Sequence, residues 1–182
     1  MTLFRKKYRI ESIRCRTWDY TGSGLYFITI CTQHRNPYFG AVRDEIMHLS
    51  NVGRIAESQW KELPAHFDDV TLDEFVVMPD HFQAIIAISG PKNPPRLIRP
   101  DLPLREPLRS PEPRSLGNVI RLYKAGVSRW CNKAGIPFAW QAGFHDRILF
   151  TSSLEGIRQY IRDNPKNWGK ALECPGGIDV HG

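Results

Sequence analysis

Two pairs of side chains in this sequence stand at spacings that could place them side by side. His81 and Gln83 are two residues apart in an apolar, β-branched stretch, and Tyr160 and Asn164 are four apart in a stretch of helical period. Residues two apart share one face of a strand, so an imidazole nitrogen and an amide oxygen could bind one divalent ion. Residues four apart lie one helical turn apart. A tyrosine hydroxyl beside an oxygen ligand could attack a phosphodiester if a metal ion polarised the phosphate.

Each pair also has an ordinary structural explanation. A histidine that begins a strand is more often exposed or hydrogen-bonded than bound to a metal. Tyr160 lies at the edge of an apolar helical stripe formed by Leu154, Ile157 and Ile161, which is typical of an amphipathic core tyrosine. Taken by themselves, the residue types and spacings favour this structural interpretation and leave the chemical one open.

The elements that would position these residues follow from hydrophobic periodicity. The terminal helix has Ser152 and Glu155 at capping-box spacing, and Pro165 predicts its end near Asn164. The order β-α-β-β-α-β-α predicts an α+β sandwich, with helices on one face of an antiparallel sheet. We predict strands over 25–32, 70–78, 81–88 and 146–150, and helices over 50–63, 116–135 and 152–164.

Length and composition predict one globular domain over residues 1–182. The chain has 41% apolar and 24% charged residues, with neither a run of eighteen apolar residues nor an apolar stretch behind its basic start. We therefore expect no membrane span and no secretory signal. Its four cysteines are widely separated, so we expect no cysteine zinc site, and a cytoplasmic location.

Positive charge is concentrated in two segments. A basic N-terminal arm occupies residues 1–20, and a Pro/Arg-rich flexible insertion over 90–115 holds eight of the fourteen prolines. Such clustering favours a polyanion partner, although a charged surface that only maintains solubility remains an alternative. The basic helix over 116–135 continues the second segment. The cations that we expect to contact phosphates are Arg5, Lys6, Lys7, Arg14, Arg16, Arg121, Lys124 and Arg129.

Four stretches of the chain resemble the REP-associated tyrosine transposases, within the single-tyrosine (Y1) transposases of the insertion-sequence-200-like superfamily. They occur in the family's order and cover most of the chain outside the insertion. They are SIRCRTWDYTGSGLYFITICTQHRNPYFG (12–40), LDEFVVMPDHFQAII (72–86), RSLGNVIRLYKAGVSRW (114–130), and FAWQAGFHDRIL with IRQYIRDNPKNW (138–168).

This resemblance implies a ferredoxin-like (RRM-like) HUH endonuclease domain acting on single-stranded or hairpin DNA, as a monomer or a homodimer. It also implies a divalent metal, Mg²⁺ or Mn²⁺, and a 5′-phosphotyrosine intermediate. Carried onto this chain, His81 is the first metal-binding histidine, Phe82 the hydrophobic residue of the motif and Tyr160 the nucleophile. Asn164 is the polar residue that completes the metal site.

The sequence departs from the family motif at Gln83, which replaces the second histidine. Its amide oxygen suits Mg²⁺ or Mn²⁺ but is a weaker donor than imidazole, so we expect metal affinity to fall by roughly 10-fold or more. Two alternatives to an active transposase therefore remain: a hairpin-binding protein that no longer cuts, and an RNA-binding module on a similar sheet. His145 and Asp146 could touch metal or DNA, although a structural role before the last strand is the simpler explanation.

Overall fold

The computed structural model describes residues 3–4, 8–9, 23–89 and 115–169. The basic side chains of the N-terminal arm and nearly all of the Pro/Arg-rich insertion lie outside these residues. At the start of the chain, two short strands, β1 (Leu3–Phe4) and β2 (Tyr8–Arg9), pair antiparallel.

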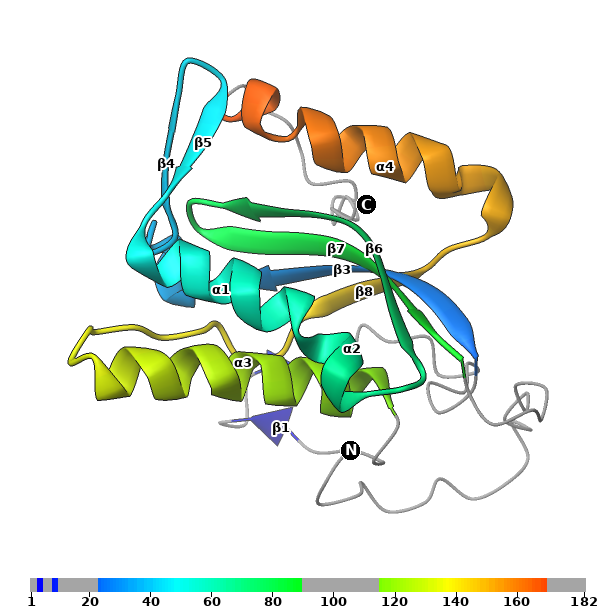
Figure 1. The fold of residues 1–182 in the computed structure, drawn as a ribbon, viewed down its shortest axis with the longest axis horizontal. Coiled ribbons are helices and arrows are strands. Elements are labelled where there is room, and N and C mark those ends of the chain that lie inside the picture. The colour runs from blue at the N-terminus through cyan, green and yellow to red at the C-terminus, as the bar shows by residue number, and fades with distance from the viewer. Residues whose placement is uncertain (1–2, 5–7, 10–22, 90–114, 170–182) are drawn as a thin grey trace.

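A four-stranded antiparallel sheet forms the centre of the described fold (Figure 1). Its strands are β3 (Gly24–Cys31), β6 (Val70–Met78), β7 (His81–Ile88) and β8 (His145–Ile148), in the order β6-β7-β3-β8. The predicted strands over 70–78 and 81–88 have these bounds in the structure, because two alternating apolar runs flank a Pro-Asp turn. With its helices, the sheet has the βαββαβ order of a ferredoxin-like fold, as expected.

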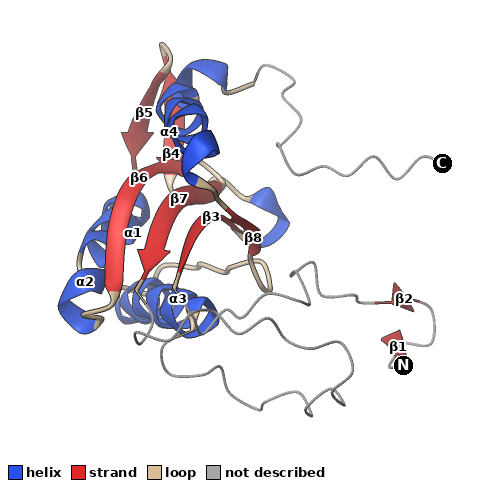
Figure 2. Cartoon of the chain, turned by 90° about the vertical axis from the view of Figure 1, so that its right-hand side faces the viewer, coloured by secondary structure: helices blue, strands red, loops and turns tan. Residues whose placement is uncertain are grey.

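The helices α1 (Asn51–Lys61) and α3 (Leu116–Lys133) cover one face of the sheet (Figure 2). Serine side chains cap both: the Ser50 hydroxyl accepts from the Gly53 amide, and the Ser115 hydroxyl accepts from the Asn118 amide. The short helix α2 (Leu63–His66) follows α1. The main core lies between this helical layer and the sheet, and its largest fully buried side chains include Tyr26, Trp60, Phe82 and Tyr123.

The helix α4 (Leu154–Asp163) lies on the other face of the sheet, away from α1 and α3 (Figures 1 and 2). It packs there in a smaller apolar cluster that contains the buried side chains of Phe27, Ile85, Leu149 and Ile161. The expected layer of helices on one face therefore holds for α1 and α3, whereas α4 forms a third layer. The four-stranded sheet therefore lies between α4 on one face and α1 with α3 on the other.

Two features of the predicted last helix are wrong in detail. The 3-10 turn Thr151–Ser153 precedes α4, its N-cap is Ser153, and no side chain caps it. Glu155 does not form the predicted capping box with Ser152, because Ser152 lies within the 3-10 turn and is not the N-cap; Glu155 pairs with two arginines. The helix does end at Asp163, but Asn164 keeps helical dihedral angles and leads into the 3-10 turn Pro165–Asn167.

A β-hairpin between β3 and α1 does not appear among the predicted elements. Its strands are β4 (Gly40–Arg43) and β5 (Ile46–Leu49), preceded by the 3-10 turn Gln33–Arg35. Asp44 and Glu45 make the connection with positive φ angles of 51° and 62°. Hairpin turns of this kind favour Asn-Gly or Asp-Gly, so the Asp-Glu pair gives no turn signal in the sequence. None of the helices in the described residues is both long and apolar enough to cross a membrane.

The hydroxyl of Tyr123 provides a test of the core. It is buried and has no hydrogen-bond partner among the described residues, and its burial raises the pKa of the phenol. Because a buried, unsatisfied hydroxyl costs free energy, we expect Tyr123→Phe to leave the free energy of unfolding unchanged or raise it by about 1 kcal/mol. Chemical denaturation measures this, and a loss of stability of about 1 kcal/mol or more would contradict it.

Candidate active site

His81 and Gln83 open β7 on the sheet face that α4 covers. The intervening Phe82 and the following Ala84 point to the other face and are fully buried in the main core. His81 exposes 6% of its surface and Gln83 only 1%. Strand alternation thus places both polar side chains on one face, as the spacing predicts. Buried polar groups require partners, and the structure supplies them.

The imidazole of His81 is oriented by a carboxylate. His81 Nδ1 lies 2.6 Å from Asp80 Oδ1, and Asp80 Oδ2 lies 3.2 Å from Arg35 Nε. A carboxylate on Nδ1 holds the proton there and leaves Nε2 as the free ligand atom, which is the usual support of a metal-binding histidine. The ring of Trp168 stacks against the imidazole, with centroids 6.0 Å apart and planes at 29°.

Gln83 connects the sheet to the end of α4. Its Oε1 accepts a hydrogen bond from Asn164 Nδ2 at 2.6 Å, and its Nε2 donates to Thr29 Oγ1 at 3.4 Å. Thr29 lies directly across from Gln83 on β3. The predicted pair of Gln83 and Asn164, separated by 81 residues in the chain, is therefore in direct contact.

Tyr160 lies on α4 one turn before Asn164, on the same side of the helix. Its ring packs edge-on against Phe27 of β3, with centroids 6.1 Å apart. Phe27 and Thr29 are two residues apart on one strand face, so the Tyr160 and Gln83 contacts are neighbours on β3. Tyr160 is partly exposed.

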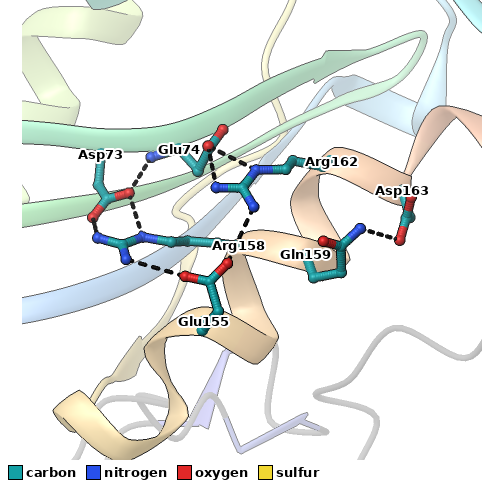
Figure 3. Close-up of polar contacts among 7 residues, drawn as sticks. All are labelled: Asp73, Glu74, Glu155, Arg158, Gln159, Arg162 and Asp163. Atoms are coloured by element: carbon teal, nitrogen blue, oxygen red, sulfur yellow. Dashed lines mark hydrogen bonds and ion pairs between the residues drawn. The ribbon is translucent and has the colours of Figure 1, made fainter.

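Ion pairs join α4 to the edge strand β6 (Figure 3). Arg158 donates from Nε and Nη2 to the two carboxylate oxygens of Asp73, at 2.9 and 2.6 Å. Arg162 donates from Nε to Glu74 Oε1 at 2.8 Å, and Glu155 lies 3.2 Å from Arg158 and 3.1 Å from Arg162. The strand register shifts between Leu72 and Phe75, and both acidic residues within this bulge pair with α4.

The electrostatics of this network favour its charged form. Hydrogen bonds from Arg158 hold the pKa of Asp73 below its usual value, against the opposing effect of burial. Arg158 and Arg162 likewise lower the pKa of Glu155. The hydrogen bonds to Asp73 and Glu155 raise the pKa of Arg158. All three groups are thus ionised at neutral pH.

The side chains around Gln83 fit a weakly held Mg²⁺ or Mn²⁺. They offer one imidazole nitrogen and two amide oxygens, and such ions accept oxygen ligands while keeping several waters. No carboxylate is among these donors, and the described residues contain no group of three or more His, Cys, Asp or Glu side chains able to hold a metal ion. Among the described contacts of these side chains, the carboxylate is that of Asp80, behind His81.

The three expected DNA-binding cations that lie within the described residues are not brought to this face. Arg121, Lys124 and Arg129 belong to α3, on the opposite face of the sheet. Lys124 donates to the carbonyls of Gln141 and Gly143 at 2.7 and 2.9 Å, and burial lowers its pKa, so it supports the loop that follows α3. Arg121 and Arg129 are exposed. The other expected cations, Arg5, Lys6, Lys7, Arg14 and Arg16, lie outside the described residues.

The remaining residues fall into two groups. His145 and Asp146 open β8 rather than precede it, and His145 is exposed. Asp80, Thr29 and Trp168 contact the expected ligands but received no role in the sequence analysis. Trp168 follows the 3-10 turn Pro165–Asn167 in an extended conformation, beyond the end of α4, so helical periodicity gives no signal for its contact with His81.

Comparisons with known proteins agree with this architecture. No protein-family model matches the chain. An uncharacterized protein of Haemophilus influenzae is 34% identical over 165 residues, which cover 87% of this chain and 89% of that protein. A solved structure of a REP-associated tyrosine transposase bound to a REP hairpin matches with a TM-score of 0.57 at 14% identity, over 87% of this chain and 75% of that one.

The match to the solved transposase structure confirms the fold expected from the resemblance. It extends over most of the chain, which contains a four-stranded antiparallel sheet and a C-terminal helix. The chain therefore belongs to one family with the Haemophilus influenzae protein, and its fold is that of a REP-associated tyrosine transposase.

Proposed function

We propose that this protein is a metal-dependent, single-tyrosine endonuclease and transposase that nicks and rejoins single-stranded DNA at hairpin sites. The contact between Asn164 and Gln83 carries the proposal, because it places Tyr160 one helical turn from the polar end of β7. The shared fold with a transposase bound to a REP hairpin supports the choice of substrate.

The cleavage step needs few protein groups. The Tyr160 oxygen attacks the scissile phosphorus and loses its proton to solvent, while the bond from phosphorus to the 3′ oxygen breaks. The leaving 3′ oxygen takes up a proton, and the 5′ phosphate stays joined to the tyrosine. In the reverse step a 3′ hydroxyl attacks the phosphotyrosine, rejoins the strand and frees Tyr160. Phosphodiester-bond energy is kept in the intermediate, so no further co-reactant is consumed.

His81, Gln83 and Asn164 would hold the metal ion. When bound, it would supply Lewis-acid polarisation of the scissile phosphate. Asp80 fixes the ring of His81 and its tautomer. Gln83 and Asn164 keep each other in place, and Thr29 holds the Gln83 amide from the neighbouring strand. The exposed Arg121 and Arg129, on the opposite face, would contact DNA flanking the cleavage site.

Replacement of Tyr160 by Phe tests the nucleophile. We expect Tyr160→Phe to lower covalent protein–DNA adduct by at least about 100-fold and to leave hairpin affinity unchanged, since only the attacking oxygen is lost. The adduct is measured on a denaturing gel after incubation with labelled hairpin DNA and Mg²⁺ or Mn²⁺. Tyr38→Phe, at another partly exposed tyrosine, is the control. Adducts that survive in Tyr160→Phe would refute the assignment.

A second candidate is a hairpin-binding protein without cleavage activity. The hydrogen bond from Asn164 to Gln83 Oε1 favours this candidate, because the oxygen that would bind the metal is a weak ligand and already accepts a hydrogen bond within the protein. Such a protein would bind the hairpin equally well with and without a chelator, and it would form no adduct at any metal concentration.

Substitution of Gln83 by His distinguishes these candidates. Imidazole is the stronger donor, so we expect Gln83→His to lower the metal concentration for half-maximal adduct formation by about 10-fold. Gln83→Ala should abolish the adduct and leave hairpin affinity unchanged. If the wild type forms no adduct and Gln83→His does, the binding protein is the correct description. An adduct that forms equally in the presence of a chelator would contradict the metal dependence.

A further inference from the structure

The ion pairs between β6 and α4 lie on the flank of α4 opposite to Tyr160. By helical periodicity, the buried stripe of Ile157 and Ile161 runs along the middle of the docked surface. Arg158 and Arg162 lie on one side of this stripe and contact β6. Tyr160 and Asn164 lie on the other side, where they contact β3 and β7.

Apolar contacts alone fix the rotation of α4 weakly. Among the described residues, Ile161 is the one fully buried side chain of this ten-residue helix. A helix of this length is not stable by itself and depends on its contacts. Leu154, Ile157 and Tyr160 pack against the same cluster but stay partly exposed, so apolar contacts fix the rotation of α4 less firmly than a fully buried stripe would.

We propose that Arg158, held by Asp73, is a positioning residue that sets the rotation of α4 and so the place of Tyr160 and Asn164 over β7. This inference rests on the proposed function. The two parallel hydrogen bonds between guanidinium and carboxylate restrict direction as well as distance. Arg162 and Glu74 repeat the restraint one turn later, and Glu155 joins the two arginines.

The bulge in β6 is the feature that makes this restraint possible. In a regular strand, consecutive side chains point to opposite faces, so Asp73 and Glu74 could not both face α4. The register shift between Leu72 and Phe75 brings both to the same helix. Asp73 is also partly shielded, with 23% of its side chain exposed, which makes its ion pair stronger than an isolated surface pair.

Hydrogen–deuterium exchange on the free protein tests the restraint without DNA. We expect Asp73→Asn to accelerate amide exchange in α4 by about 10-fold, because the restraint is lost and the helix opens more often. Exchange in α1 and α3 should stay unchanged. The matched control is Glu57→Gln, which breaks an ion pair with Lys61 on α1 and should leave α4 exchange unaffected. Unchanged exchange in α4, or equal acceleration in all helices, would overturn the proposal.

Reaction kinetics then test whether the restraint serves the site. In Asp73→Asn, the rate of adduct formation at saturating hairpin should fall by about 10-fold, while the hairpin dissociation constant stays the same. The double variant Asp73→Asn/Arg158→Gln should be no worse than Arg158→Gln alone, because Asp73 acts through Arg158, which also pairs with Glu155. Additive losses, or a loss confined to hairpin affinity, would overturn the proposal. Absence of adduct in the wild type would refute the proposed function, whereas the exchange measurement would still decide the role of Arg158.

Discussion

The docking of α4 on the face of the sheet opposite to α1 and α3 is the interaction on which the candidate site depends. The sheet and the α1–α3 layer form a complete core without it, since Trp60, Phe82 and Tyr123 are buried between them. The site, by contrast, combines side chains of β7 with side chains of α4, and neither element holds it alone. A small apolar cluster stabilises the packing of α4 on the sheet, and ion pairs with the edge strand β6 restrain the orientation of the helix.

Strand β7 serves the core and the site at the same time. Phe82, Ala84 and Ile86 fill the core on one face, while His81 and Gln83 stand on the other. Because the side-chain period of a strand is two, a slip of one residue would bury the polar pair in the core and expose Phe82. The core packing that fixes the register of β7 therefore also fixes the position of its polar side chains. A change in the register of β7 would therefore also move His81 and Gln83 to the other face of the sheet.

The sequence predicts the sheet well and the assembly around it less well. The bounds of β6 and β7 follow from apolar alternation on either side of Pro79-Asp80, because these signals are local. The contact of Gln83 with Asn164 depends on where α4 docks, which no local pattern states. The capping box fails because Ser152 lies within the 3-10 turn and the helix begins one residue later than its spacing predicts, so Glu155 is not at the capping-box position and pairs with Arg158 and Arg162. The family resemblance, and not hydrophobic periodicity, predicts that Tyr160 and Asn164 share one site with His81.

Gln83 changes the strength of the donor set but not its charge. A histidine in this position would be a neutral ligand, as glutamine is, so the exchange leaves the net charge of the site the same. The amide oxygen of Gln83 has two lone pairs, so it can accept from Asn164 and still present one to a cation, whereas an acceptor imidazole nitrogen has one. In the proposed site, Asp80 would contribute negative charge through His81, and this support does not involve Gln83. The exchange of histidine for glutamine would therefore leave the net charge of the proposed site unchanged, and its expected cost falls on metal affinity.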